Sequence, residues 1–329
     1  MKTTLKLMHM CCVLSVVLSV APAAAQNYPA RAVRILVGTP PGGPPDVMAR
    51  GTAQVLSQRF GQPFVVENRV GADSMIAGEA CARAPADGYV LFVSASLGVV
   101  LNPLVRAKMP YDPFRDLAPV IHYGYAVNGI LVHPAVPAKT LQELFELAKA
   151  KPGTVTFGTY GAASPPTLYL EWLRKVKGIS FLNVPYKAAS LAWPAMLAGE
   201  VQVSTFNLGQ AIANVKAGKA RPLAVMLPKR SSLLPDLPTY KEGGMDIAMI
   251  TTFGLYAPGE TPKEIIRQIN AEVVNGLFNK AEMREKFLIS QGMELQPPAG
   301  GSPEEFAAFL RAERDNFASI VKMAGVKPE

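Results

Sequence analysis

The feature that most constrains the fold of this chain is a regular alternation of short apolar runs with helical patterns. In the first hundred residues, strand-like runs at 33–37, 64–67 and 89–94 are separated by helical patterns at 46–60 and 75–84. Short β-runs separated by helices are typical of βαβ units, whose strands lie parallel in one sheet. The sequence therefore predicts an α/β fold with a parallel sheet.

The same alternation returns in the middle of the chain. A run at 130–132 and a helix from Thr140 come first, and further helices are expected at 167–176, 191–198 and 208–217. The strands of this series are expected at 155–158, 181–184, 201–205 and 222–226. We interpret the series as a second, similar α/β half.

The last quarter of the chain is expected to complete the first half. A strand at 252–257 is followed by long helical patterns at 262–278 and 303–321. The chain leaves the first half near Tyr125 and re-enters it near Thr251, and two crossings between two lobes make a hinge. The expected bounds are residues 26–126 with 251–329 for lobe 1, and residues 127–250 for lobe 2.

Three of the expected helices begin with start signals. Thr140 opens the run Thr-Leu-Gln-Glu, in which its hydroxyl can accept from an orphan amide while Glu143 reaches back. Thr261 and Ser302 each stand before a proline and three residues before a Glu. This arrangement predicts a cap followed by a proline at the first helical position.

The first 25 residues are expected to be a secretory signal peptide. Lys2 and Lys6 give a positive start, an apolar run spans Met8 to Ala21, and three alanines precede Gln26. This three-part pattern predicts cleavage after Ala25 and a periplasmic location. A membrane anchor is the alternative, but the apolar run of about 14 residues is shorter than the roughly 20 that span a bilayer.

Few groups remain for metal or covalent chemistry once the signal peptide is removed. Cys81 is then the single cysteine, and we interpret it as a small buried residue. The histidines that remain are His122 and His133, too few for a zinc site with thiolate ligands. No Gly-x-Ser-x-Gly elbow marks a nucleophile. We expect no metal, no cofactor and no catalytic residue.

The charge balance argues against nucleic acid as a partner. The formal net charge is +8, and the loss of Lys2 and Lys6 leaves +6. The basic residues are scattered, without the arginine–lysine stripe and interleaved aromatic residues of a nucleic-acid-binding surface. A mild positive balance favours small anions weakly.

A stiff loop from Gly38 to Asp46 joins the first expected strand to the first expected helix. Ligands of open α/β sheets bind outside the carboxyl ends of the strands, where helix N-termini offer amides and partial positive charge. Glycines let amides approach a ligand, and prolines fix φ. A capped turn without a ligand is the alternative. The ligand contacts predicted here are Pro41, Gly42, Gly43 and Asp46.

Loops after the other expected strands carry hydroxyl groups, small residues and amides. Each loop alone is a common connection, and only the shared position at strand ends indicates a site. Such a set suits a polar anion held by neutral donors. The ligand-binding residues predicted in these loops are Ser74, Ser94, Ser96, Tyr160, Gly161, Ala162, Ser164, Tyr186 and Asn207.

Several motifs, taken in order, resemble one protein family. They include "YPARAVRILVGTPPGG", "GQPFVVENRVGA", "APADGYVLFVS", "VHPAVPAKTLQEL" and "KRSSLLPDLPT". These motifs resemble the Bug-type solute-binding proteins of tripartite tricarboxylate transporters over essentially the whole mature chain. The resemblance implies a type II periplasmic-binding fold, with two α/β lobes closing on a small organic carboxylate. It also implies delivery to a membrane permease or presentation to a sensor, and no enzymatic activity.

The resemblance is weakest in the loops expected to touch the ligand. Asp73 and Met75 stand in a stretch that is Gly-Gly-Asn in the family, and Tyr160 opens a loop that is usually Ser-Gly-Asn-Gly. Gln202 and Phe206 replace aspartates. These residues add bulk, apolar surface or negative charge, which favours an aromatic or partly apolar carboxylate. The alternative is that some of these positions never meet the ligand.

Three functions remain open from the sequence. The first is a periplasmic receptor that captures a small organic carboxylate for a tripartite tricarboxylate transporter. The second is a ligand-presenting partner of a sensor kinase or another receptor with the same fold. The third is an exported hydrolase, for which no nucleophile–base pair is recognisable. The chain is expected to be a monomer.

Overall fold

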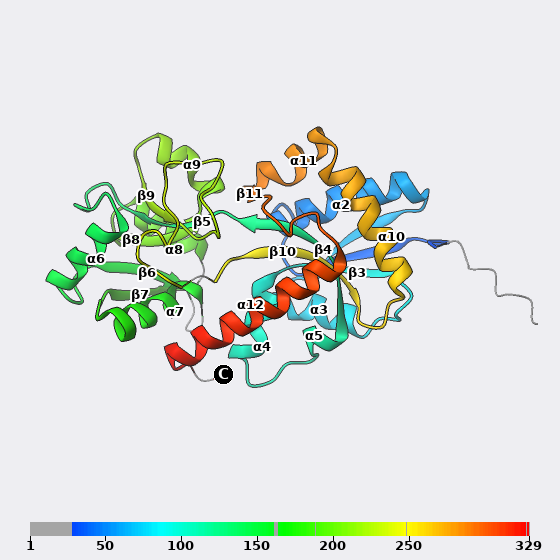
Figure 1. Cartoon of the computed structure of the whole chain (residues 1–329), viewed down its shortest axis with the longest axis horizontal. Coiled ribbons are helices and arrows are strands. Elements are labelled where there is room, and N and C mark those ends of the chain that lie inside the picture. Colours follow the sequence, from blue (N-terminus) through cyan, green and yellow to red (C-terminus); the bar gives the residue numbers. More distant parts are fainter. Residues whose placement is uncertain (1–27, 161–163, 188, 248, 327, 329) are drawn as a thin grey trace, which may run out of the picture.

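The computed structural model describes residues 28–160, 164–187, 189–247, 249–326 and 328 of the 329-residue chain. The expected signal peptide lies outside the described residues. Two β-sheets lie side by side, each flanked by helices (Figure 1). We call the six-stranded sheet with its helices lobe 1, and the five-stranded sheet with its helices lobe 2. The two-lobed α/β fold predicted from the sequence is confirmed.

Lobe 1 is built on a mixed sheet with the strand order β11-β4-β10-β3-β1-β2. Its strands are β1 Val33–Val37, β2 Phe64–Asn68, β3 Val90–Ala95, β4 Leu117–Ala126, β10 Thr252–Pro258 and β11 Met293–Glu294. Its α-helices are α2 Pro44–Phe60, α3 Met75–Ala82, α4 Asn102–Val105, α5 Pro113–Asp116, α10 Lys263–Val273, α11 Ala281–Phe287 and α12 Pro303–Ala324. Shorter helical segments are η1 Ala72–Ser74, η2 Leu97–Leu101, η4 Val274–Phe278 and η5 Ile289–Gln291.

Lobe 2 has the strand order β7-β6-β8-β5-β9. Its strands are β5 Asn128–Val132, β6 Thr156–Tyr160, β7 Leu182–Tyr186, β8 Val203–Asn207 and β9 Arg221–Val225. Its helices are α6 Leu141–Ala150, α7 Pro165–Trp172, the π-helical η3 Leu173–Lys177, α8 Ala189–Leu197 and α9 Leu208–Lys216. The order β2-β1-β3 in lobe 1 corresponds to β7-β6-β8 in lobe 2, so both lobes contain the same parallel βαβαβ unit.

The register of the strands places the carboxyl ends of most strands at the junction between the lobes. The chain passes from β4 to β5 through Val127, so β4 ends and β5 begins at the junction. β10 starts beside the end of β4 and runs antiparallel to β3, so β3 ends there as well, together with β1 and β2, which run parallel to it. By the same argument, β8 ends at the junction between the lobes because it runs antiparallel to β5. β6 and β7 run parallel to β8 and therefore end there too.

Two crossings connect the lobes, as the sequence predicts. The first passes through Val127, and the second returns to lobe 1 just before β10. The amide of Ala126 donates to the carbonyl of Thr251 at 2.8 Å, so the two crossings lie beside each other. A pair of adjacent crossings is the construction of a hinge between two lobes.

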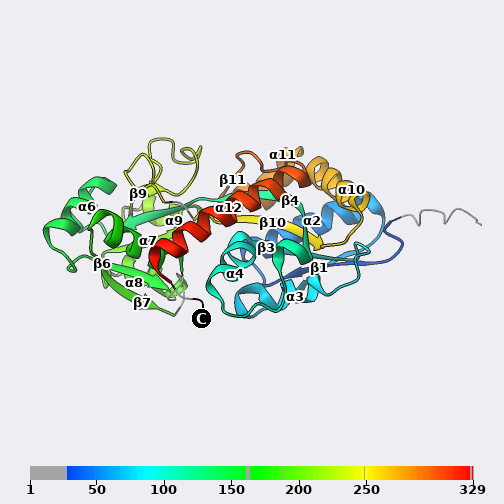
Figure 2. The same cartoon turned by 60° about the horizontal axis from the view of Figure 1, so that its bottom comes forward.

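Helix α12 adds a third link between the lobes. It packs along lobe 1, where Phe306 lies 5.5 Å from Tyr256 between ring centroids, and runs on toward lobe 2 (Figures 1 and 2). At its end, Lys175 of lobe 2 donates from Nζ to the carbonyl of Ala324 at 2.6 Å. Buried residues of α12, such as Phe317, belong to one hydrophobic core cluster with residues of both lobes.

Most expected elements are present, with shifted ends. α2 begins at Pro44, two residues before the expected start, because its first turn contains two prolines. Ser302 and Glu305 form the expected capping box. Thr261 was expected to cap α10, but the N-cap is Pro262, and the buried hydroxyl of Thr261 has no hydrogen-bond partner among the residues that the structure describes. The ten-residue strand β4 was not predicted, because Pro119, His122 and Gly124 interrupt its apolar pattern.

Candidate functional site

The loops that follow β1, β2, β3, β6, β7 and β8 form the candidate site, and we call them the strand-end site. All six come at the junction of the lobes. In open α/β sheets, ligands bind at this edge, where strands end and helices begin. The location follows from strand register alone.

Helix α2 begins at the strand-end site with two prolines. Gly43 is the N-cap, has no side chain that could cap, and is followed by Pro44 and Pro45. Prolines carry no amide hydrogen, so the helix terminus presents only the amides of Gly43 and Asp46 from its first residues. Gly42 has φ +90°, which requires glycine, and a Cβ placed there would meet no atom within 4 Å. The space beside this terminus is therefore open.

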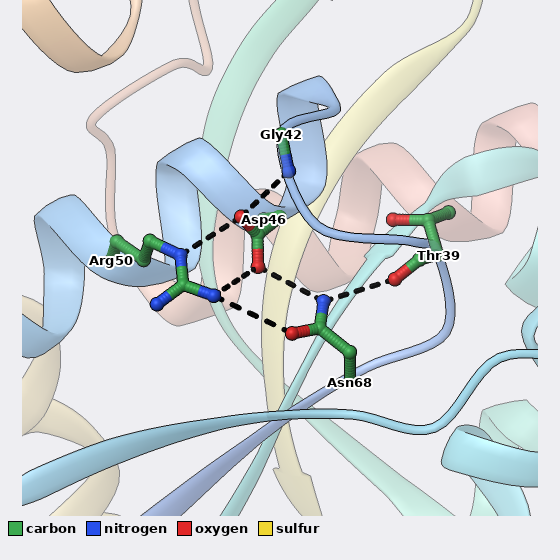
Figure 3. Close-up of polar contacts among 5 residues, drawn as sticks. All are labelled: Thr39, Gly42, Asp46, Arg50 and Asn68. Carbon is green, nitrogen blue, oxygen red and sulfur yellow. Dashed lines mark hydrogen bonds and ion pairs between the residues drawn. The ribbon is translucent and has the colours of Figure 1, made fainter.

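Asp46 serves the loop itself and does not offer its carboxylate to a ligand (Figure 3). Its carboxylate accepts from the amide of Gly42 at 2.9 Å, from Arg50 at 2.9 and 3.0 Å, and from Nδ2 of Asn68 at 2.9 Å. Asn68 also donates to the carbonyl of Thr39 at 3.0 Å. These bonds occupy the amide of Gly42, so the expected ligand contacts at Gly42 and Asp46 become contacts that hold the loop.

The charge of Asp46 is stabilised although the side chain is buried. Burial alone would raise the pKa of this carboxyl group, but hydrogen bonds from Arg50, Gly42 and Asn68 outweigh burial and hold the pKa below its ordinary value. The carboxylate is therefore ionised and fully paired. Sequence reasoning missed Arg50 and Asn68; the i,i+4 spacing of Asp46 and Arg50 was the available signal.

Three consecutive residues after β2 have left-handed backbone conformations. Ala72, Asp73 and Ser74 have φ values of 46°, 51° and 71°. Side chains make this conformation unfavourable by roughly 1–2 kcal/mol per residue. Ser74 packs against Gly38, where a Cβ would lie 2.3 Å from the Ser74 Cβ. The predicted site residue Ser74 is thus placed at the ends of both β1 and β2.

The two serines at the end of β3 are buried, and their hydroxyls contact backbone groups. Ser94 donates to the carbonyl of Ala95 at 3.1 Å. Ser96 donates to the carbonyl of Ile250 at 3.3 Å and accepts from the amide of Thr252 at 3.1 Å. Ser96 therefore ties the end of β3 to the second crossing, which is a hinge contact where a ligand contact was expected.

In lobe 2, Tyr160 and Tyr186 lie opposite each other in neighbouring strands. Burial raises the pKa of Tyr160, and a hydrogen bond with Thr205 partly offsets this. Tyr186 is half-buried and lies over Gly158, where a Cβ would come 3.5 Å from its ring. The two predicted residues are adjacent at the strand-end site, with the hydroxyl of Tyr160 engaged by Thr205.

Helix α7 begins in the same way as α2. Ser164 is the N-cap, makes no side-chain capping bond, and is followed by Pro165 and Pro166. Its hydroxyl lies 3.1 Å from the hydroxyl of Thr167. The predicted residues Gly161 and Ala162, which precede this helix, lie outside the described residues.

Asn207 is placed at the first crossing, against lobe 1. A Cβ built on Gly292 would come 2.9 Å from Oδ1 of Asn207 and 3.0 Å from Cα of Gly209. The amide of Leu208 donates to the carbonyl of Val127 at 2.6 Å. Lobe 1 and lobe 2 therefore meet here backbone to backbone, and glycine is needed on both sides.

Two of the unusual residues noted in the sequence have different environments. Gln202 precedes β8, at the end of the sheet away from the junction, where its Oε1 accepts from the amide of Thr156 at 2.9 Å. Gln202 is therefore not at the strand-end site. Phe206 is at the carboxyl end of β8 and stacks on Trp193, with 4.4 Å between ring centroids and 10° between planes. This aromatic pair was not predicted.

The titratable groups used by enzymes and metal sites are sparse. In the part of the chain that the structure describes, no group of three His, Cys, Asp or Glu side chains could hold a metal ion. Cys81 is buried, and burial raises the pKa of its thiol. Burial lowers the pKa of His122 to about 3, so this imidazole is neutral. Neither residue is at the strand-end site.

Two lobes of one repeated topology, joined by adjacent crossings and with strand ends meeting at the junction, define a two-lobed solute-binding protein. The family described as "Tripartite tricarboxylate transporter family receptor" matches residues 48–326. The chain is 33% identical over 313 residues to protein BugT of Bordetella pertussis (strain Tohama I), with 93% of each chain covered. The chain therefore belongs to this family of receptors, and the Bug-type resemblance is confirmed.

Solved structures give the same result. R. palustris Rpa4515, solved with adipate, is 32% identical with a TM-score of 0.77, covering 92% of this chain and 100% of that chain. MatC (Rpa3494) from Rhodopseudomonas palustris, solved with bound malate, is 25% identical with a TM-score of 0.72, covering 89% and 100%. Among the described residues, no helix is both long and apolar enough to cross a membrane.

Proposed function

We propose that this protein is exported to the periplasm, captures a small organic carboxylate between its two lobes, and delivers it unchanged to the permease of a tripartite tricarboxylate transporter. It acts as a monomer without a catalytic step. Residues 26–126 and 251–329 move as one lobe, and residues 127–250 move as the other. Membership of the receptor family, together with relatives solved with adipate and malate, supports this proposal.

The observation that carries the proposal is the meeting of six strand ends and two similar helix N-termini at one hinged junction. Each terminus has its partial positive charge and few competing side-chain donors. A carboxylate bound there accepts hydrogen bonds from fixed amides, which gain strength when closure of the lobes excludes water. The ligand-facing residues in this proposal are Pro41, Gly43, Ser74, Ser164, Tyr186 and Phe206.

The proposal predicts stabilisation of the protein by its ligand. A carboxylate present at 100 times its Kd adds about 2.7 kcal/mol to the free energy of unfolding. A panel that includes adipate, malate, hexanoate and benzoate, screened by thermal unfolding and confirmed by calorimetry, measures this. Failure of every carboxylate to raise Tm or to release heat would contradict the proposal.

A variant that fills the space beside α2 tests the position of the site. Gly43 has ordinary dihedral angles, φ −79° and ψ 167°, and a Cβ there would meet its nearest neighbours at 3.9 and 4.0 Å. Gly43→Leu therefore keeps the fold while its side chain occupies the terminus, and affinity for the ligand falls at least ~10-fold. Ala312→Leu adds the same volume on the exposed face of α12 and leaves affinity unchanged.

A further inference from the structure

The left-handed turn at residues 72–74 is held in place by neighbouring side chains. Nδ2 of Asn102 donates to the carbonyl of Asp73 at 3.2 Å, and the carboxylate of Asp73 pairs with the guanidinium of Arg106. Ser74 rests on Gly38 at the end of β1. Strain of this kind persists only where surrounding contacts determine the conformation, and it is typical of functional loops.

The turn lies at the strand-end site and presents its carboxylate to solvent. A Cβ on Gly98, just after β3, would come 3.4 Å from the carbonyl oxygen of Asp73. The turn therefore reaches across the ends of β1, β2 and β3. The side chain of Asp73 is 70% exposed, whereas that of Asp46 is 2% exposed. Of these two carboxylates, Asp73 is the one that a ligand at this end would meet.

Both arginines that contact these carboxylates are already paired. Arg50 is bound to Asp46 through two nitrogens, and Arg106 is bound to Asp73. Each guanidinium therefore already has a carboxylate beside it, which offsets the positive charge that a ligand carboxylate would otherwise meet. The two pairs therefore add no net positive charge to the lobe 1 end of the site, and in the Asp73–Arg106 pair the carboxylate is the more exposed partner, at 70% against 37%.

We propose that Asp73 is a specificity-determining residue that selects a ligand with one carboxylate over a ligand with a carboxylate at each end. Asp73 does so by occupying Arg106 and by repelling a second carboxylate. The inference rests on the proposed function, since it concerns the ligand of the same site. The single carboxylate then binds a helix terminus, and the uncharged part of the ligand lies beside Asp73.

The experiment compares two six-carbon ligands that differ in one charged end. Adipate and hexanoate are titrated into the wild type, Asp73→Asn, Arg106→Gln and the double variant, and the ratio of their affinities is measured by calorimetry. Asparagine keeps the shape of aspartate and tolerates the left-handed conformation. The wild type is expected to prefer hexanoate. Asp73→Asn is expected to raise the relative affinity for adipate roughly tenfold, because Arg106 becomes available.

The remaining variants separate charge from a change in the loop. Arg106→Gln leaves Asp73 unpaired and lowers the relative affinity for adipate, and the double variant loses the gain seen with Asp73→Asn. If the wild type prefers adipate, or if Asp73→Asn leaves the ratio within about twofold, the inference is wrong while the proposed function stands. If the wild type binds neither ligand nor any other carboxylate of the panel, the proposed function fails and takes the inference with it.

Discussion

The two helix N-termini at the junction begin alike and differ in charge. α2 starts with Gly43-Pro44-Pro45-Asp46, and α7 starts with Ser164-Pro165-Pro166-Thr167; they follow the equivalent strands β1 and β6. In lobe 1, the third helical residue is a buried carboxylate that folds back onto Gly42. In lobe 2, it is a threonine whose hydroxyl contacts the hydroxyl of Ser164. The two βαβαβ units therefore share the same backbone arrangement at this helix start but place a charged residue there in lobe 1 and a neutral residue in lobe 2.

This difference separates the features that both units need for folding from the residues that can determine ligand binding. The strands, their order and the paired prolines are shared by the two units, because each unit must place a helix start at the junction. At the start of α2 the carboxylate of Asp46 already occupies the amide of Gly42, whereas α7 has a neutral residue at the same position. A ligand carboxylate is consequently expected to lie nearer the start of α7, with lobe 1 providing shape.

The largest expected effect on stability comes from removing the hydrogen-bond network of Asp46 in lobe 1. Asp46→Ala leaves Asn68, Arg50 and the amide of Gly42 without their shared acceptor, and is expected to lower the free energy of unfolding by about 3–4 kcal/mol. Chemical denaturation measures the change. Asp315→Ala, which removes a 76% exposed carboxylate on α12, should change stability by less than about 0.5 kcal/mol. Equal effects of the two substitutions would contradict a structural role for Asp46.

The next effect concerns the helix that links the lobes. Burial raises the pKa of Glu313 on α12 to about 7, and its Oε2 has no partner among the described residues. Because the folded pKa exceeds the unfolded value, the stability contribution is present below the unfolded pKa and is lost as the pH rises through about 7. Glu313→Gln stays neutral, so above pH 8 it is expected to be more stable than the wild type by up to about 3 kcal/mol.

The pH dependence of stability distinguishes an effect of Glu313 ionisation from an effect of packing. Tyr125 of lobe 1 and Tyr169 of lobe 2 are the titratable groups that interact with this carboxylate, and burial keeps both neutral by raising the pKa of each. The wild type and Glu313→Gln should therefore have the same stability at about pH 4 and diverge as the pH rises. A constant difference between pH 4 and pH 9 would show that packing, and not ionisation, distinguishes them.

The smallest expected effect on stability comes from a substitution at the carboxyl end of β8 in lobe 2. Phe206→Ala removes the ring stacked on Trp193 and is expected to lower the free energy of unfolding by about 2 kcal/mol. Because Phe206 faces the ligand in the proposed site, affinity for an aromatic carboxylate such as benzoate is expected to fall more than affinity for malate. Leu182→Ala, a 49% exposed residue on β7, is the matched control with little effect on either. Equal losses for both ligands would remove Phe206 from the binding surface.

Much of the fold could be predicted because local patterns and the overall topology agree. The βαβ alternation predicted the parallel units, and the proline-glycine stretch at residues 40–45 marked the start of α2. β4 was not predicted because its residues 119, 122 and 124 break the apolar run, although its neighbours β10 and β11 stabilise it as a strand. Thr261 was misread as a cap because Pro262 allows two starting positions for α10.

The site was less predictable, because its contacts join residues that are distant in sequence. The Asp46 network depends on Asn68, 22 residues away, and the hinge bond of Ser96 depends on Ile250. Gln202 shows a second cause: β8 begins at Val203, and a residue at the start of a strand lies at the opposite end of the sheet from the ligand loops. Sequence placed the loops correctly at strand ends but could not tell which side chains were already paired.

A structure determined with a bound carboxylate tests the central claim most directly. The account predicts that the carboxylate lies at the junction, within hydrogen-bond distance of the start of α2 or α7, and that the lobes are closed around it. A carboxylate bound instead in the outer groove of about 440 Å³ between the starts of α10 and α12, with the junction unchanged, would contradict it.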